Sequence, residues 1–177
     1  MDVMFDLETL DTKPTAVILS LGAVKFDPKT QSVPDQLPKL LLKFDIDAQN
    51  DLGRTTSEDT IEWWGKQPAH IQEEAFGLEG RTPLAEAIDQ FHKFVWNSDR
   101  VWSQGCFDIV IVEDLYRMVG RTPPWNYWQI RDSRTLFDFV DGKMDRSKHH
   151  DAMEDALEQA RAVQRALKKI GWNGEKL

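Results

Sequence analysis

The sequence predicts an α/β fold in which helices flank a mixed central sheet. Strand-like segments crowd the first part of the chain, strand-like and helix-like segments then alternate, and a long apolar stripe at helical spacing follows near the end. An early run of strands followed by such alternation is typical of a mixed sheet. With 177 residues, 41% of them hydrophobic, the chain fits one compact domain over residues 1–177 with a single core.

The first three strands are expected to pair as an antiparallel meander. Residues 1–8 alternate modestly between apolar and polar residues and carry Val3 and Phe5, and the second strand is a nearly continuous apolar run. A loop around Pro14 and a turn around Pro28 separate the three segments. These strands are predicted at residues 1–8, 16–26 and 37–44.

The rest of the chain is expected to alternate between helices and short strands. Apolar residues at helical spacing mark the helices, Ser57 is a suitable N-cap, and Gly120 and Gly171 are suitable stops. The helices are predicted at residues 57–64, 68–76, 83–95, 108–119, 133–140 and 151–170, and the strands at 100–104 and 128–131.

The composition is acidic, with 30 Asp and Glu against 22 Lys and Arg and a net charge of -8. Strong non-specific duplex binders are usually basic, so a nucleic-acid contact would be local and weak. Cys106 is the single cysteine and cannot form an internal disulfide. The N-terminus lacks a signal-peptide pattern, and the longest apolar run is too short to cross a bilayer. We therefore expect a soluble, cytoplasmic protein without a membrane partner.

Acidic residues stand at the ends of several predicted elements. Asp6 and Glu8 share one face of the first strand, because side chains at i and i+2 point the same way. Asp108 opens a helix directly after a strand, and Asp155 lies in the first turn of the last helix, just after His150. Each acid has an ordinary explanation, since such pairs occur by chance and acids are favoured at helix N-termini.

Together, these residues form a better case for metal-dependent hydrolysis than any one of them alone. Mg²⁺ prefers carboxylate oxygens, and bound cations offset the repulsion between neighbouring acids. Two cations about 3.5–4 Å apart can clamp the attacking and leaving oxygens of an in-line displacement at phosphorus. A histidine is suited to take a proton from the attacking water.

These segments resemble the DEDD superfamily of DnaQ-like 3′→5′ exonucleases, which have a ribonuclease H-like fold. Its first motif, Asp-x-Glu-Thr, is matched by residues 6–9, and its second, an Asp after an aromatic residue, by residues 107–108. The third motif of the His-type (DEDDh) branch is matched by His150 and, five residues later, Asp155, whereas His149 is one residue too far away. The subgroup that looks closest contains the Rv2179c-like exoribonucleases and the phage T4 exonuclease A type.

The resemblance implies a role for each motif residue. The cofactors would be two divalent metal ions, Mg²⁺ or Mn²⁺, and the partner would be the 3′ end of a single-stranded RNA or DNA. His150 would be the general base and would lie in the loop before the last helix. Thr9 and Leu10 would contact the terminal nucleotide. The metal ligands would be Asp6, Glu8, Asp108 and Asp155.

Aromatic and basic residues suggest further substrate contacts. Seven tryptophans are present, and an exposed ring can stack on a base with about 1–3 kcal/mol of stabilisation. Trp63 and Trp64 are adjacent on a predicted helix, so one is expected in the core and the other against a base. Phe107, beside the second-motif acid, is a further expected substrate contact. The nucleic-acid backbone could be flanked by Arg131, Arg134, Arg146 and Lys148.

Three other hypotheses remain open at this point. The chain could be a non-catalytic nucleic-acid-binding or scaffolding module on the same fold, although none of its five motif positions is degraded. It could be an unrelated acidic metal-binding protein, in which case the four acids would not converge. It could also be an endonuclease of the ribonuclease H type, which would cut circular substrates. A homodimer is possible, and the sequence leaves the choice between RNA and DNA open.

Overall fold

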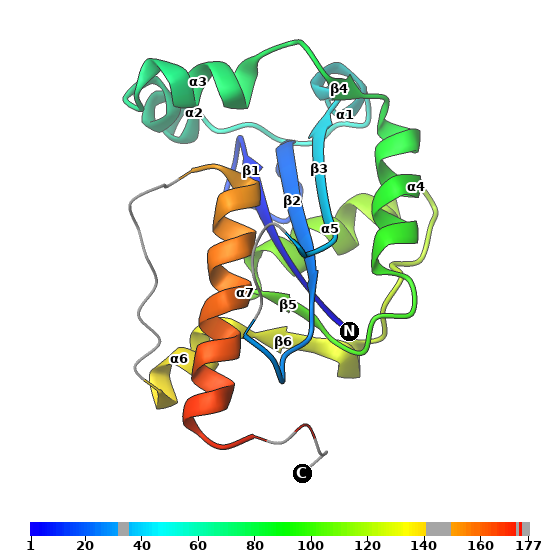
Figure 1. Cartoon of the computed structure of the whole chain (residues 1–177). Coiled ribbons are helices and arrows are strands. Elements are labelled where there is room, and N and C mark those ends of the chain that lie inside the picture. Colours follow the sequence, from blue (N-terminus) through cyan, green and yellow to red (C-terminus); the bar gives the residue numbers. More distant parts are fainter. Residues whose placement is uncertain (32–35, 141–149, 173, 175–177) are drawn as a thin grey trace.

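The structure, a computed structural model, describes residues 1–31, 36–140, 150–172 and 174, and its strands form a six-stranded sheet in the order β4-β3-β2-β1-β5-β6 (Figure 1). β1, β2 and β3 pair antiparallel, as the sequence predicts. β4 runs parallel to β3, and β5 and β6 run parallel to β1, so the sheet is mixed. The strands are β1 (Asp2–Thr9), β2 (Ile18–Phe26), β3 (Lys39–Phe44), β4 (Arg81–Thr82), β5 (Val101–Ser103) and β6 (Ile130–Asp132).

Helices follow the strands much as the apolar spacing predicts. Ser57 caps α2 through the backbone N–H of Thr60, and Asp151 caps α7 through those of Met153 and Glu154. In the described residues, the helices are α1 (Ile46–Asp51), α2 (Glu58–Gly65), α3 (Ala69–Phe76), α4 (Leu84–Val95), α5 (Phe107–Met118), α6 (Ser133–Phe139) and α7 (Ala152–Lys169), with a 3₁₀ turn at Tyr127–Gln129.

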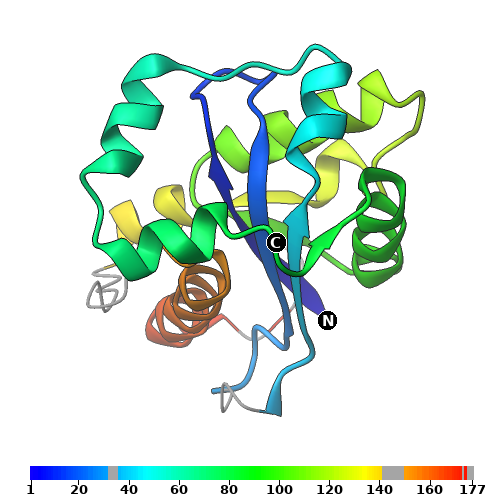
Figure 2. The same cartoon turned by 90° about the horizontal axis from the view of Figure 1, so that it is seen from above.

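The alternation of β1 places its side chains in two different cores. Val3 and Phe5 lie in the core formed with α4 and α5, and Met4 lies in the core formed with α7. Figure 2 shows α7 on one face of the sheet and α4 and α5 on the other. Asp6 and Glu8 continue the Met4 series, so their side chains belong to the face that α7 covers.

Helix α7 approaches the sheet most closely at Gly22. This residue pairs with Asp6 across β1 and β2. A Cβ atom at Gly22 would lie 2.2 Å from the carbonyl oxygen of Ala152 and 2.4 Å from the nitrogen of Met153. The first turn of α7 therefore rests on the backbone of β2, and this close approach brings the start of α7 beside Asp6.

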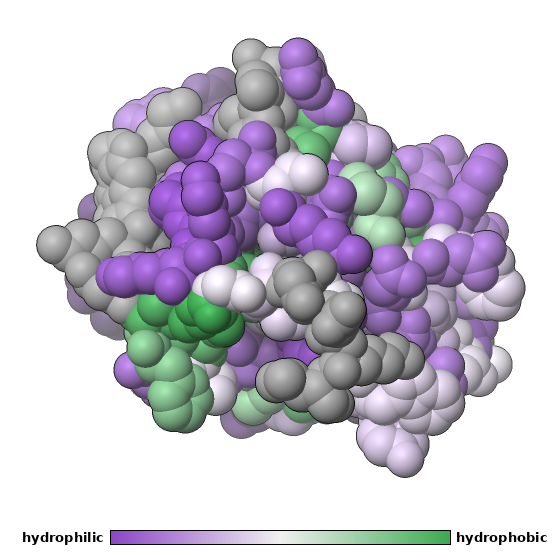
Figure 3. Space-filling view, turned by 60° about the horizontal axis from the view of Figure 1, so that its bottom comes forward, coloured by the Kyte–Doolittle hydropathy of each residue, from purple (hydrophilic) through white to green (hydrophobic). Residues whose placement is uncertain are grey.

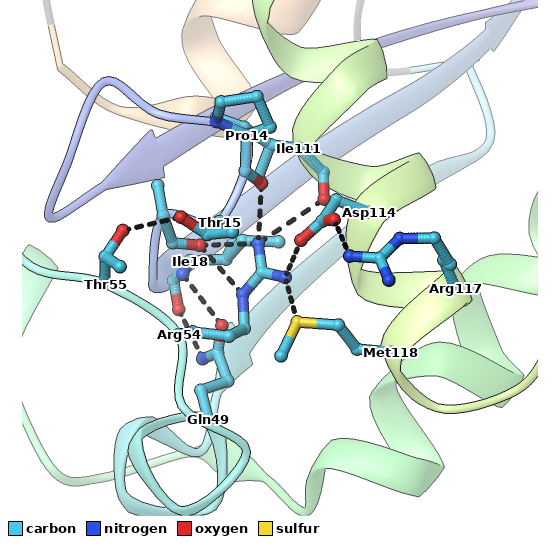
Figure 4. Close-up of polar contacts among 11 residues, drawn as sticks. Pro14, Thr15, Ile18, Gln49, Arg54, Thr55, Ile111, Asp114, Arg117 and Met118 are labelled. Carbon is cyan, nitrogen blue, oxygen red and sulfur yellow. Dashed lines mark hydrogen bonds and ion pairs between the residues drawn. The ribbon is translucent and has the colours of Figure 1, made fainter.

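A buried arginine ties the segment after β1 to α5 (Figure 4). The guanidinium of Arg54 is fully buried; its Nε and Nη2 donate to the carbonyl oxygen of Ala16 at 2.9 and 2.6 Å. Further bonds reach the carbonyls of Pro14 and Ile111, and Nη1 pairs with Asp114 at 3.2 Å. Because backbone carbonyls accept most of these bonds, Arg54 fixes the path of the chain itself.

The sequence did not predict two short elements. Helix α1 has six residues, and its register is set by Gln49, which exchanges hydrogen bonds with the backbone of Ile18 at 2.8 Å. Strand β4 has two residues and forms only because it pairs with the end of β3. Both lengths are too short for a periodic pattern. In the described residues, no helix has the length and apolar character needed to cross a membrane.

Candidate active site

Three carboxylates from opposite ends of the chain meet at the end of β1. Ligand oxygens of Asp6, Glu8 and Asp155 all lie within 4.8 Å of one another. Asp6 and Glu8 come from one face of β1, and Asp155 comes from the first turn of α7, which Gly22 allows to lie close to the sheet. This convergence contradicts the hypothesis of an unrelated acidic protein with dispersed carboxylates.

Asp108 lies beside this cluster in the first turn of α5. Its side chain is 4% exposed, and its Oδ1 accepts a hydrogen bond from the backbone N–H of Leu7 at 3.1 Å. It is not part of the group of ligand atoms within 4.8 Å. Its charge nevertheless acts on the pKa values of Asp6 and Glu8, so all four predicted acids belong to one electrostatic unit.

Three of these acids, Asp6, Glu8 and Asp108, are hard to ionise together in the metal-free protein. Burial, and then the charges of Asp108, Glu8 and Asp155, raise the pKa of Asp6 well above its ordinary value. Burial and the charge of Asp155 raise the pKa of Glu8 to about 8, and burial raises that of Asp108 to about 7. Oxygen ligands with uncompensated charge suit a divalent cation, so this acidic cluster could hold a metal ion.

His150 lies directly before α7, in the loop position that the sequence predicts. Its backbone N–H donates to Oδ2 of Asp155 at 3.1 Å, and its ring packs edge-on against Trp63 with 4.6 Å between ring centroids. The backbone adopts φ of 70°, a left-handed conformation that is unusual for a residue other than glycine. Such strain is concentrated at functional sites. His149 lies outside the described residues.

A cleft of about 370 Å³ opens next to the carboxylates. Glu8, Thr9, Trp63 and Phe107 are among the residues that line it. Trp63 is 39% exposed, so part of its ring is available to a ligand. Thr9 is held in place because its hydroxyl donates to the carbonyl of Asp11 at 2.8 Å. The cleft thus joins the acidic cluster to four of the five predicted substrate contacts, since Trp64 also lines it.

Two of the predicted substrate contacts, Trp64 and Leu10, are buried and do not offer a free surface. Trp64 is 1% exposed, and its indole N–H donates to the carbonyl oxygen of Thr9 at 2.9 Å. Leu10 is 6% exposed and packs in the same core cluster as Trp64. Trp64 is therefore the core member of the tryptophan pair and supports the wall of the cleft, and only Trp63 can stack on a base in this conformation.

The basic residues are divided between the two ends of the sheet. The charge of Arg134, at the start of α6, acts on Asp108 and lowers its pKa against the effect of burial. Arg131 instead lines a larger pocket of about 1020 Å³ at the other end of β1, together with Asp2 and Arg100. The surface at this end is mainly hydrophilic (Figure 3). The prediction that Arg131 flanks the substrate is thus not supported, and Arg146 and Lys148 lie outside the described residues.

Two residues that shape the site are not among those that the sequence predicts. Gly22 permits the close approach of α7, and Gln159 donates a hydrogen bond to Oδ1 of Asp6 at 2.7 Å. The spacing of four residues between Asp155 and Gln159 places both on one helix face and could have indicated the second residue. Gly22 lies within an apolar strand, where a glycine can mark a close backbone approach.

The fold and the site together define a class of enzyme. A mixed sheet with acids at the end of β1 and the start of α5, and a His–Asp pair at the start of α7, is the arrangement of a ribonuclease H-like exonuclease of the DEDDh type. The chain belongs to the family described as the Rv2179c-like 3′-5′ exoribonuclease domain, which it matches over residues 1–167. It is accordingly a 3′–5′ exonuclease, a hydrolase.

Two solved structures resemble this fold over nearly their whole length. One is exonuclease X in complex with 5′ overhanging duplex DNA, with a TM-score of 0.51 and 14% identity over 98% of this chain and 95% of that one. The other is the nuclease domain of 3′hExo, a DEDDh family member, bound to rAMP, with a TM-score of 0.56 and 14% identity over 95% and 92%. At this identity the likeness concerns the fold. A search of the curated proteins gave no match.

Proposed function

We propose that this protein removes nucleotides from the 3′ end of single-stranded RNA or DNA by metal-dependent hydrolysis. The observation that carries the proposal is the convergence of Asp6, Glu8 and Asp155 at one end of a cleft lined by Thr9 and Trp63. RNA is the first substrate to test, because the family description names an exoribonuclease. A net charge of -8 favours a short single-stranded end over a long duplex.

Each residue of the site has a proposed task. Asp6, Glu8 and Asp155 would hold two divalent cations, Mg²⁺ or Mn²⁺, with Asp108 beside them. When bound, the cations would supply compensation for the charge that develops on the phosphate and a lower pKa for the attacking water. His150 would accept the proton of that water as general base. The exposed face of Trp63 would stack on the terminal base.

A cleavage assay tests this proposal. We would incubate 5′-labelled single-stranded RNA and DNA, in linear and circular form, with Mg²⁺, with Mn²⁺ and with EDTA. The expected result is a ladder of linear products that shorten from the 3′ end, that disappears with EDTA and that leaves circles intact. Cleavage of circles would indicate an endonuclease. Binding without any cleavage would indicate a non-catalytic binding module on the same fold.

The stability of the metal-free protein is expected to fall as the pH rises from about 5 to about 8. Burial raises the pKa of Glu8 from 4.5 to about 8 and that of Asp108 from 3.8 to about 7. In this interval the folded state keeps protons that the unfolded chain has lost. The free energy of unfolding should therefore fall by on the order of 1 kcal/mol per pH unit for each of the two groups. The contribution of Glu8 and Asp108 is fully present below about pH 4 and fully lost above about pH 8.

Urea unfolding in EDTA measures this dependence. In a second series without EDTA, added Mn²⁺ should raise the unfolding midpoint more at pH 8 than at pH 5, because the cation binds the ionised carboxylates. A midpoint that rises with pH in EDTA would show that Glu8 and Asp108 are ionised without a cation and would contradict the prediction.

Replacing Gly22 by alanine is expected to lower the rate of cleavage by roughly a hundredfold. The added methyl group would overlap the backbone of Ala152 and Met153, so α7 must move away from β2 and carry Asp155 with it. A misplacement of about 1 Å in an active site can cost on the order of 10²-fold in rate. The measurement is the initial rate on a 5′-labelled oligonucleotide at saturating metal.

Gly65→Ala is the matched control. A Cβ atom at Gly65, the last residue of α2, would meet nothing within 4 Å, so its rate should equal that of the wild type. The unfolding midpoint of Gly22→Ala shows how much folded protein is assayed. A wild-type rate for Gly22→Ala would show that the placement of Asp155 does not depend on this contact.

A further inference from the structure

Helix α7 carries a second polar residue toward β1, one turn after Asp155. The side chain of Gln159 is 4% exposed, and its Nε2 donates to Oδ1 of Asp6 at 2.7 Å. The two residues are 153 positions apart in the sequence. A neutral amide on the last helix therefore contacts the acid at the centre of the carboxylate cluster.

A neutral donor suits this position for an electrostatic reason. The charges of Glu8, Asp108 and Asp155 disfavour ionisation of Asp6, whereas the hydrogen bond from Gln159 favours it. A lysine or arginine at this place would pair with Asp6 and compete with a divalent cation for its charge. An amide leaves the charge of the cluster unchanged. It also engages one carboxylate oxygen, Oδ1, and leaves Oδ2 for another ligand.

The carbonyl end of the same amide shows which contact sets its orientation. Oε1 of Gln159 is buried and has no hydrogen-bond partner among the described residues. An unpaired buried acceptor costs free energy. When Asp6 is ionised, as it must be to bind a cation, turning the amide over would bring Oε1 against Oδ1 of Asp6, two acceptors in contact, and would lose the bond that the NH₂ group makes. The contact with Asp6 therefore determines how the amide lies.

We infer that Gln159 is a positioning residue of the metal site, whose amide holds the Asp6 carboxylate in the orientation in which Asp6 and its neighbours bind a divalent cation together. This inference rests on the proposed function, in which the same carboxylates hold the cations. Gln159 is not among the residues that line the cleft, so it acts through Asp6 and not on the substrate.

The test compares two glutamines of the same helix. Gln159→Met removes the amide and keeps the approximate size of the side chain. Gln164→Met is the matched control, because Gln164 is 1% exposed and donates to the backbone carbonyl of Asp27, away from the acids. Calorimetric titration of the metal-free proteins with Mn²⁺ should show binding about 10- to 100-fold weaker for Gln159→Met, the usual effect of removing such a supporting bond, and unchanged for Gln164→Met.

Kinetics and a second variant separate positioning from general damage. For Gln159→Met, kcat at low Mn²⁺ should fall and should recover at saturating Mn²⁺, while the KM for the oligonucleotide stays at the wild-type value. The unfolding midpoint in EDTA reports whether the variant is folded. Gln159→Asn keeps the amide but is one methylene shorter and cannot make the 2.7 Å contact, so it should weaken Mn²⁺ binding as well.

The outcomes distinguish the inference about Gln159 from the proposed function. If the wild type cleaves and Gln159→Met binds Mn²⁺ as tightly as the wild type, the inference is overturned and the proposed function stands. An equal loss of affinity in Gln164→Met would assign the effect to helix packing and would also overturn it. A wild type that neither binds Mn²⁺ nor cleaves would overturn the proposed function, and the inference with it.

Discussion

Replacing Asp6 by asparagine is expected to reduce 3′-end cleavage at least about a thousandfold, equivalent to roughly 4 kcal/mol of lost transition-state stabilisation. Asp6 lies among the charges of Glu8, Asp108 and Asp155, and asparagine keeps its shape but removes its charge. The same change removes a buried acid whose ionised form is disfavoured by the charges of its neighbours. The unfolding midpoint in EDTA should therefore not fall, so activity and stability are expected to separate.

Asp2→Asn is the control for this substitution. Asp2 lies at the opposite end of β1, is fully buried, and accepts a hydrogen bond from the indole of Trp102 at 2.8 Å. Its replacement tests the loss of a buried carboxylate on the same strand without touching the cluster. We expect nearly wild-type kcat for Asp2→Asn. An Asp6→Asn protein that retains more than a small fraction of the activity would remove Asp6 from the catalytic set.

The second large effect is expected on stability. Replacing Arg54 by methionine should lower the free energy of unfolding by about 3–5 kcal/mol, because it leaves Asp114 without its buried partner and several carbonyls without their donor. The carbonyl of Ala16 loses two bonds at once. Urea unfolding at constant pH measures the change, which should appear as a lower midpoint with an unchanged slope.

Arg117→Met provides the comparison, since Arg117 pairs with the same carboxylate of Asp114 from the surface. Its side chain is 72% exposed, and the pair spans three residues of α5. Exposed pairs of this kind contribute about 0–1 kcal/mol. If the two substitutions cost the same, the burial of Arg54 and its bonds to backbone carbonyls do not contribute to the fold as we expect.

The sequence predicted the features that depend on local pattern and motif. The first three strands, the fold class and the loop position of His150 followed from periodicity, turn signals and the resemblance to a known family. The pairing of β4 with β3 and the burial of Leu10 and Trp64 depend on contacts between distant segments. No pattern within a short window contains that information.

The placement of the acids also depends partly on local pattern and partly on contacts between distant segments. That Asp6 and Glu8 share a strand face follows from their spacing, and the structure brings Asp155 to them. The reason that α7 can lie so close, an absent side chain at Gly22, becomes visible only when the helix and the strand are seen together. In the sequence, Gln159 looks like an ordinary helix residue, because its contact with Asp6 appears only in the folded structure.

The distance in sequence between Asp6 and the residues of α7 has a consequence for biosynthesis. Strand β1 leaves the ribosome well before α7, and Asp155 and Gln159 are made after all the strands of the sheet. A nascent chain that ends before α7 lacks one side of the acidic cluster and cannot assemble it. The order of translation thus delays the assembly of the acidic cluster until nearly all elements of the fold have been made.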